Sequence, residues 1–449
     1  MITILAFILL LGILVIVHES GHFIAARMCG VQVEKFSFGF GPKIFAKTVG
    51  ETEYRISLIP LGGYVKMLGE NPEEQENDLD SGKTFSGKKW WQKVFIAFNG
   101  PFFNLLLAII ILSLTYMIGL KTYDLQPIVG NVSSSQTDLH QLKPHDEILS
   151  IDGEKIDGWI SIIELWRDSY KPIHAVKILR DGEVITLNMK NFDFKLWLTD
   201  VESYAPPIIG EVYYGLPAYQ SGLKKGDEIL TINGKNVNSW SEMRGIITAN
   251  SDTELRLSVR RDSEKLSIIV TPQLNPGEKE EAGIIGITQK LELVNIERYG
   301  VFKAIEYGTI TTFTVVVGYY KGLFKLIKRP SEAGKNVGGP IMIAAMTKQQ
   351  TEQGLTSYLS FMAMISIILM VMNLLPMPVL DGGQILFSVI EGIMRKPLKI
   401  GLQKIFQQVG IAVLILLMFF AFYNDISRYI TRQLSLKNNV TTVPENQKK

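Results

Sequence analysis

Four stretches of the chain are apolar and long enough to cross a membrane. A helix needs about 20 apolar residues to span the roughly 30 Å of hydrocarbon in a bilayer. The uncharged stretches are 1–17, which continues to 26 if Glu19 is tolerated, 94–120, 354–380 and 405–424. They predict a multi-pass α-helical membrane protein with four transmembrane helices. The expected helices cover 1–26, 94–120, 354–386 and 405–424.

The first stretch is expected to be a transmembrane helix and not a cleaved signal peptide. It has no basic segment before it, no small-x-small pattern at its end, and a glutamate inside it. The composition agrees with a membrane protein, because 47% of the 449 residues are hydrophobic. The formal charge of +2 gives no sign of a nucleic-acid partner, and a lone Cys29 excludes an intramolecular disulfide.

Basic residues between the apolar stretches indicate which segments face the cytoplasm, because cytoplasmic loops are enriched in Lys and Arg. The segment 27–93 carries ten of them and the short segment 387–404 carries four. We therefore expect these two segments inside, and the long segment 121–353 and the tail 425–449 outside. Four further basic residues within 321–329 lie near a membrane end on the outer side, against this bias.

Three polar side chains, His18, Glu19 and His22, interrupt the first apolar stretch within "LVIVHESGHFIAA". On a helix the two histidines lie on one face and can bind one metal ion, while Glu19, about 100° round, can reach a water on that ion. This is the H-E-x-x-H spacing of zinc proteases. Ionisable groups in a spanning helix are costly and usually functional, which favours a zinc site over polar residues at a helix contact.

A catalytic zinc site needs a third protein ligand and an open position for water. His140, His145 and His174 lie in the predicted external segment and are poor candidates. Asp381 is a better one, because it follows two prolines in "MNLLPMPVLDGG" (372–383) that break a helix where irregular backbone is tolerated only beside a cavity or inside protein. The first and third stretches cross in the same direction, so Asp381 and the histidines can meet. An Asp-Gly-Gly turn that merely ends a helix is the alternative.

The external segment contains an internal repeat. "LKPHDEILSIDGEKIDGW" (142–159) aligns without gaps with "LKKGDEILTINGKNVNSW" (223–240). The same offset relates "RDGEVITL" (180–187) to "RDSEKLSI" (261–268). Apolar alternation around Asp-Gly and Asn-Gly turns predicts strands and one helical piece in each copy.

Both copies resemble PDZ domains, so we expect tandem PDZ-like α+β domains at 121–205 and 206–290. "GLPAYQSGLKKGD" (215–227) in the second copy is similar to the entry of a PDZ peptide groove. The first copy lacks its Pro-Ala and Ser-Gly pieces and has His145 where the second has Gly226. A pair that serves only as a spacer between helices is the alternative, because one fold hosts many roles.

Three connecting regions complete the expected layout. Residues 31–68 alternate around a "VGET" turn and predict a membrane-associated β-hairpin near the site, whose exposed edge can pair with an extended substrate. A lid or a plain amphipathic hairpin is the alternative. Residues 69–82 form an acidic linker. Residues 291–353 are expected to contain an interfacial helix and connector, within 299–329, or a helix packed on the PDZ-like pair.

In this order, the motifs resemble those of bacterial site-2 proteases of the regulator-of-sigma-E type, which are intramembrane zinc metalloproteases. The motifs are HESGH (18–22), "FGFGP" (38–42), "IPLGGYVKM" (59–67), "FNGPFFN" (98–104), the two PDZ-like copies and "NLLPMPVLDGG" (373–383). The resemblance implies that His18, His22 and Asp381 bind Zn²⁺, that Glu19 is the catalytic acid-base, and that Asn373 lies near the scissile peptide.

The resemblance also implies a biological role. Single-pass membrane proteins of the anti-sigma factor type, already shortened by a first protease, and remnant signal peptides would be cut in the bacterial inner membrane while the PDZ pair filters bulky substrates. Two other classes of protein are alternatives. A membrane-tethered PDZ adaptor predicts no bound zinc, and a metal transporter would repeat its intramembrane ligands over several spans.

Overall fold

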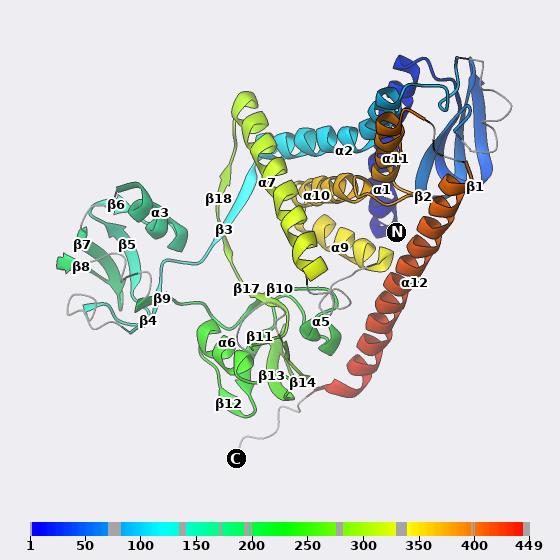
Figure 1. Ribbon diagram of the computed structural model, residues 1–449. Helices are drawn as coiled ribbons and strands as arrows, with labels where there is room; N and C mark the ends of the chain where they lie inside the picture. The colour runs from blue at the N-terminus through cyan, green and yellow to red at the C-terminus, as the bar shows by residue number, and fades with distance from the viewer. Residues whose placement is uncertain are drawn as a thin grey trace. The chain divides into compact units, whose positions relative to one another are not determined.

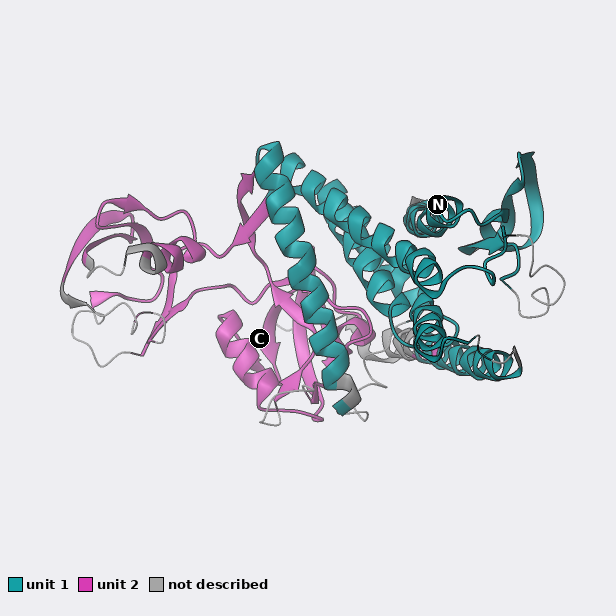
Figure 2. Cartoon of the chain, turned by 45° about the horizontal axis from the view of Figure 1, so that its top comes forward, with its two compact units in different colours: residues 1–120, 298–425 teal, residues 121–297, 426–449 magenta. Residues whose placement is uncertain are grey.

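The computed structural model describes residues 2–70, 82–133, 141–169, 173–192, 197, 200–274, 282–328, 339–396, 398 and 400–442. The chain forms two compact units (Figure 2). The helical unit comprises Met1–Leu120 and Arg298–Asp425, and the repeat unit comprises Lys121–Glu297 and Ile426–Lys449.

Four helices in the described part of the chain are long and apolar enough to cross a membrane (Figure 1). They are α1 (Ile2–Met28), α2 (Trp90–Ile118), α10 (Leu355–Asn373) and α12 (Ile400–Asn439). Each falls on one of the four apolar stretches. α12 continues past residue 424, into the segment expected to be a tail.

The third apolar stretch forms two helices and not one. α10 ends at Asn373, and α11 (Asp381–Met394) begins after an irregular stretch, 374–380, that contains both prolines. Proline cannot donate a backbone hydrogen bond and clashes with the preceding turn, so the break is local in origin. Asp381 is therefore the first residue of a helix. The sequence had predicted it near the end of a single helix, 354–386.

The core of the helical unit lies where α1, α2 and α10 meet. Leu10, Leu14, Ala108, Ala363 and Ile367 are completely buried there. Two more helices pack on this group: α7 (Val301–Lys328) lies against α2 and α10, and α9 (Pro340–Gln353) lies against α1 and α10. The helix expected at the interface within 299–329 thus packs on the apolar helices.

A curled β-hairpin follows α1. β1 (Val33–Val49) and β2 (Thr52–Met67) are antiparallel, and Lys35 pairs with both Lys66 and Glu53. The first half of β1 therefore lies between the two halves of β2, and residues 63–67 of β2 form an edge. Of the acidic linker expected at 69–82, residues 71–81 lie outside the described residues.

The repeat unit contains two modules of the same design, which bears out the repeat in the sequence. The sheet orders are β6-β5-β7-β8 and β12-β11-β13-β14, the latter extended by β19. The first module has β4 (Val129–Val132), β5 (Glu147–Ile151), β6 (Glu154–Lys155), α3 (Trp159–Ser169), β7 (Ile173–Arg180), β8 (Glu183–Phe192) and β9 (Val201–Ser203). The second has β10 (Ile209–Val212), α5 (Pro217–Ser221), β11 (Glu228–Ile232), β12 (Lys235–Asn236), α6 (Trp240–Thr248), β13 (Leu255–Arg261), β14 (Glu264–Val270), β15 (Gln273–Leu274), β16 (Gly283–Ile284) and β17 (Ile287–Gln289).

Equivalent residues of the two modules make equivalent interactions. Arg180 pairs with buried Asp146 in the first module, and Arg261 pairs with buried Asp227 in the second. The core positions correspond in the same way, because Ile148 and Ile229 are both buried. Two short strands, β3 (Leu120–Asp124) and β18 (Glu292–Glu297), pair where the chain enters and leaves the two modules. β19 (Val440–Thr442) pairs with β14.

Candidate metal centre

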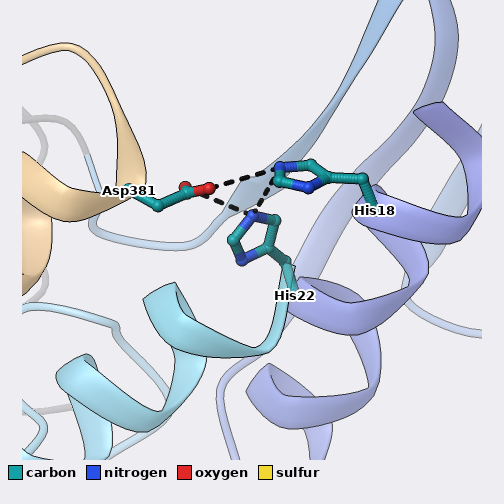
Figure 3. Close-up of side chains that lie close together, drawn as sticks. All are labelled: His18, His22 and Asp381. Atoms are coloured by element: carbon teal, nitrogen blue, oxygen red, sulfur yellow. Dashed lines mark hydrogen bonds and ion pairs between the residues drawn. The ribbon is translucent and has the colours of Figure 1, made fainter. Parts of the chain in front are cut away.

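The three residues predicted as metal ligands converge in the helical unit. Figure 3 shows the two imidazoles on successive turns of α1 and the carboxylate that reaches them from α11. His18 Nε2 lies 3.3 Å from Asp381 Oδ2, and His22 Nε2 lies 3.3 Å from Asp381 Oδ1. The two Nε2 atoms are 3.3 Å apart. Among the described residues this is the one group of three or more His, Cys, Asp or Glu that could hold a metal ion.

The spacing of these atoms fits a zinc ion. Zinc binds histidine nitrogen and carboxylate oxygen at about 2.0 to 2.2 Å in tetrahedral geometry, which places neighbouring ligand atoms roughly 3.3 Å apart. Two nitrogens and one oxygen also leave one coordination position open, as catalytic zinc sites do. The side chains of His18, His22 and Asp381 are 13%, 10% and 15% exposed, so the cluster is buried but still within reach of water.

The backbone of α2 orients His22. Its Nδ1 lies 2.9 Å from the carbonyl oxygen of Ile96, so Nδ1–H donates to that oxygen and the lone pair of Nε2 faces the cluster. Gly100 makes this approach possible, because a Cβ atom there would lie 2.2 Å from His22 Nε2. Gly21 on α1 serves the same crossing: its Cβ would lie 2.2 Å from the Asn99 carbonyl oxygen. Small residues let the two helices approach closely.

Asn104 of α2 orients the other imidazole. Its amide group lies 3.3 Å from His18 Nδ1, and its Oδ1 is buried without a hydrogen-bond partner among the described residues. The oxygen and nitrogen of an amide are assigned from the hydrogen-bond network. Exchanging the two atoms lets His18 Nδ1–H donate to Oδ1, which satisfies that oxygen and leaves Nε2 free to bind a metal.

The turn before α11 places Asp381. Gly382 and Gly383 follow it, and a Cβ atom on them would lie 2.2 Å from the Leu375 carbonyl oxygen and 2.1 Å from the Met377 carbonyl oxygen. Only glycine fits between these carbonyls. The Asp-Gly-Gly sequence thus folds the proline-containing stretch tightly against the first turn of the helix that carries the carboxylate.

Glu19 and Asn373 lie beside the three ligand candidates. The Val65 amide at the edge of β2 donates to the Glu19 carboxylate, which also interacts electrostatically with His18, His22 and Asp381. Gly63 allows this strand to approach α1, because its Cβ would lie 2.7 Å from a methyl carbon of Val15. The Asn373 amide nitrogen is 3.4 Å from His18 Nε2. A carboxylate, an amide and three potential ligands therefore share one small site.

The remaining histidines are elsewhere, and some residues of the site were not expected from the sequence. His145 and His174 belong to the first module of the repeat unit, and His140 is outside the described residues. Gly100, Asn104 and Val65 were recognised only as parts of the motifs at 98–104 and 59–67, without a role for any of them. Their importance depends on which elements meet at the crossing of α1 and α2.

Known proteins are similar to this chain along most of its length. The model of peptidase family M50 matches residues 6–417. A Pasteurella multocida protein provisionally described as a zinc metalloprotease is 34% identical over 94% of this chain and 98% of its own length. The regulator of sigma-E protease RseP of Escherichia coli is 33% identical over 94% of this chain and 98% of its own length. A solved PDZ domain of an SdrC-like protein from Listeria monocytogenes is 20% identical, with a TM-score of 0.17, over 20% of this chain and 90% of that domain.

Proposed function

The chain belongs to peptidase family M50, and on that premise we propose that it is an intramembrane zinc metalloprotease that cuts single-pass membrane proteins within the membrane. The observation that carries the proposal is the convergence of His18, His22 and Asp381, with each pair of facing ligand atoms 3.3 Å apart and Glu19 beside them. Peptide hydrolysis needs a nucleophilic water, a proton acceptor and a group that holds the carbonyl oxygen.

The residues around the cluster fill these roles. When bound, zinc lowers the pKa of its water to about 7 and stabilises negative charge on the carbonyl oxygen. Glu19 accepts the proton of the attacking water and later passes it to the leaving amine. The Val65 amide holds the Glu19 carboxylate in place. The Asn373 amide is close enough to the cluster to donate to the substrate backbone.

A substrate helix must unwind before its peptide bonds can be cut, and the β-hairpin offers a surface for the extended chain. In the described part of the chain, residues 63–67 of β2 pair with β1 on one side only, so their other side is an edge. Extended peptides bind to such edges by adding a strand. Because Val65 within this edge bonds to Glu19, a peptide added here passes the catalytic carboxylate.

The cellular role is part of the proposal. The similarity to sigma-E regulators supports a substrate of the anti-sigma factor type, cut in the bacterial inner membrane after a first cleavage outside. The basic segments 27–93 and 387–404 support an active site near the cytoplasmic side. In this arrangement the repeat modules are outside and restrict the entry of substrates with large external domains.

The decisive experiment compares purified wild-type protein with the Glu19→Gln variant on a model transmembrane segment. Zinc content is measured on both proteins. The proposal expects one zinc per chain in both and cleavage only by the wild type. No zinc and no cleavage in either protein would favour a membrane-tethered adaptor, whose function would then depend on the repeat modules.

A further inference from the structure

A polar cavity lies next to the metal-ligand cluster and has no part in the chemistry described so far. Its volume is about 140 Å³, and it is lined by the chain on both sides of Asp381, including Pro378 and Gln384. Eight of its eleven lining residues are polar or charged. Such a lining can offer hydrogen bonds and charge to a polar occupant.

One carboxylate in the cavity has no lysine or arginine partner among the residues that the structure describes. Lys93 Nζ and Glu391 Oε2 are 3.0 Å apart, and both side chains are only 12% exposed, so these two charges neutralise each other. Glu70, in contrast, accepts hydrogen bonds from the Met67 amide at 3.2 Å and from the Gln384 side chain. The basic side chain that acts on Glu70 is His22, which is neutral when it binds a metal.

Two further observations favour a cationic occupant. Burial raises the pKa of the Glu70 carboxyl, so a cation that binds there would stabilise its ionised form. The Ser86 hydroxyl also lines the cavity, and its Oγ is buried without a hydrogen-bond partner among the described residues. Among the described residues, the cavity therefore offers a carboxyl group without a Lys or Arg partner and a hydroxyl group without a hydrogen-bond partner.

The cavity lies where the substrate chain would continue. Glu70 follows β2 by three residues and is tied to its last residue, Met67. The opposite wall is α11, which begins at Asp381 and includes Glu391, within the segment 387–404 expected in the cytoplasm. A peptide paired with the edge of β2 would reach this cavity on the cytoplasmic side of the bond that is cut. Transmembrane segments carry Lys and Arg at that end.

We propose that Glu70 binds a lysine or arginine side chain of the substrate, on the cytoplasmic side of the scissile peptide bond. The inference rests on the proposed proteolytic function. Glu70 would then determine specificity, because it would select substrates with a basic residue at the cytoplasmic end of the transmembrane segment. The charge pair forms in a site shielded from solvent, where hydrogen bonds to charged groups are strong.

The test is a two-by-two comparison of kcat and KM with full-length protein. Wild type and Glu70→Gln cleave model transmembrane peptides that carry either Arg or Gln at one position of the cytoplasmic flank, and the position is moved along the flank in successive peptides. We expect Glu70→Gln to raise KM about tenfold or more for the Arg peptide at one position, and to leave the Gln peptide unchanged. An equal loss for both peptides, or no loss for either, would overturn the inference.

Matched controls separate this inference from other effects. Glu51→Gln removes the same charge from an exposed carboxylate of the hairpin, 3.0 Å from Lys83, and should not distinguish the two peptides. If Glu51→Gln raises KM for the Arg peptide alone, the overall negative potential of the protein attracts the arginine, and the inference fails. Equal zinc content in Glu70→Gln and wild type excludes damage to the metal site. Absence of cleavage by the wild type would refute the proposed function itself.

Discussion

The methyl group added by Gly100→Ala would test whether the crossing of α1 and α2 builds the metal centre. The new Cβ would lie 2.2 Å from His22 Nε2, far inside the 3.4 Å at which ordinary contact begins. The His22 imidazole cannot rotate away freely, because its Nδ1 is hydrogen-bonded to the Ile96 carbonyl of α2, the helix that also carries Gly100. Metal–ligand distances tolerate only about 0.2 Å, so the displaced nitrogen is lost as a ligand.

The expected result is a folded protein that binds zinc poorly. Overpacking costs about 1 to 3 kcal/mol, and replacing a helical glycine by alanine returns up to about 1 kcal/mol, so the fold should survive. Zinc affinity should fall by about 100-fold or more, and cleavage of a transmembrane peptide should fall with it. Chelator competition measures the affinity, and thermal unfolding measures the stability.

The control for this variant is Gly318→Ala. Gly318 is also in a helix, α7, but outside its own turn of the helix no atom of the described residues lies within 4 Å of the position of its Cβ. This substitution should leave both zinc affinity and cleavage unchanged. If Gly100→Ala bound zinc and cleaved peptide as the wild type does, the contact between α2 and His22 would not determine the geometry of the site.

Four other outcomes are expected. Asn373→Ala should lower kcat by about 10-fold or more while zinc content is kept, and an equal loss of both would indicate a structural role. Asn104→Ala should weaken zinc binding by about 10-fold to 100-fold in a chelator titration, because it removes the partner of a ligand histidine; unchanged affinity would contradict that assignment. Asp227→Asn should destabilise the second module by about 3 kcal/mol, measured by hydrogen exchange, whereas Asp262→Asn in an exposed turn should not. Deletion of 126–290 should allow cleavage of substrates with intact external domains; unchanged discrimination between full-length and shortened substrates would refute the filter. This deletion joins chain ends that the paired strands β3 and β18 already bring together.

The sequence predicted those features whose signal is local. Apolar length is a property of one segment, so the four helices that are long and apolar enough to cross a membrane could be located without knowing their neighbours. The H-E-x-x-H spacing places its residues on one helix without reference to any other segment. The two prolines before Asp381 break a helix because proline has no backbone N–H group and clashes with the preceding turn. The repeat was visible because both copies preserve the same alternation and the same turns.

Other features depend on contacts between distant segments and could not be predicted in this way. Gly100 and Asn104 are ordinary residues of an apolar helix until α1 is placed against them. Apolar and polar residues alternate with a period of two in a flat hairpin and in a curled one. The pattern therefore could not predict that Lys35 pairs with both halves of β2. Glu70 borders a segment of acidic residues and resembles them in sequence, but it is tied to Met67 and Gln384.

Two equivalent tryptophans of the repeat have different surroundings in the two modules. Trp159 and Trp240 occupy equivalent positions of the repeat. In the first module Trp197 is completely buried and packs 6.4 Å from the Trp159 ring. In the second module Trp240 lines a cavity of about 570 Å³ between α6 and the strands β16 and β17. Leu216, within the peptide-groove motif at 215–227, is among its lining residues, and a concave site of this size is typical of ligand binding.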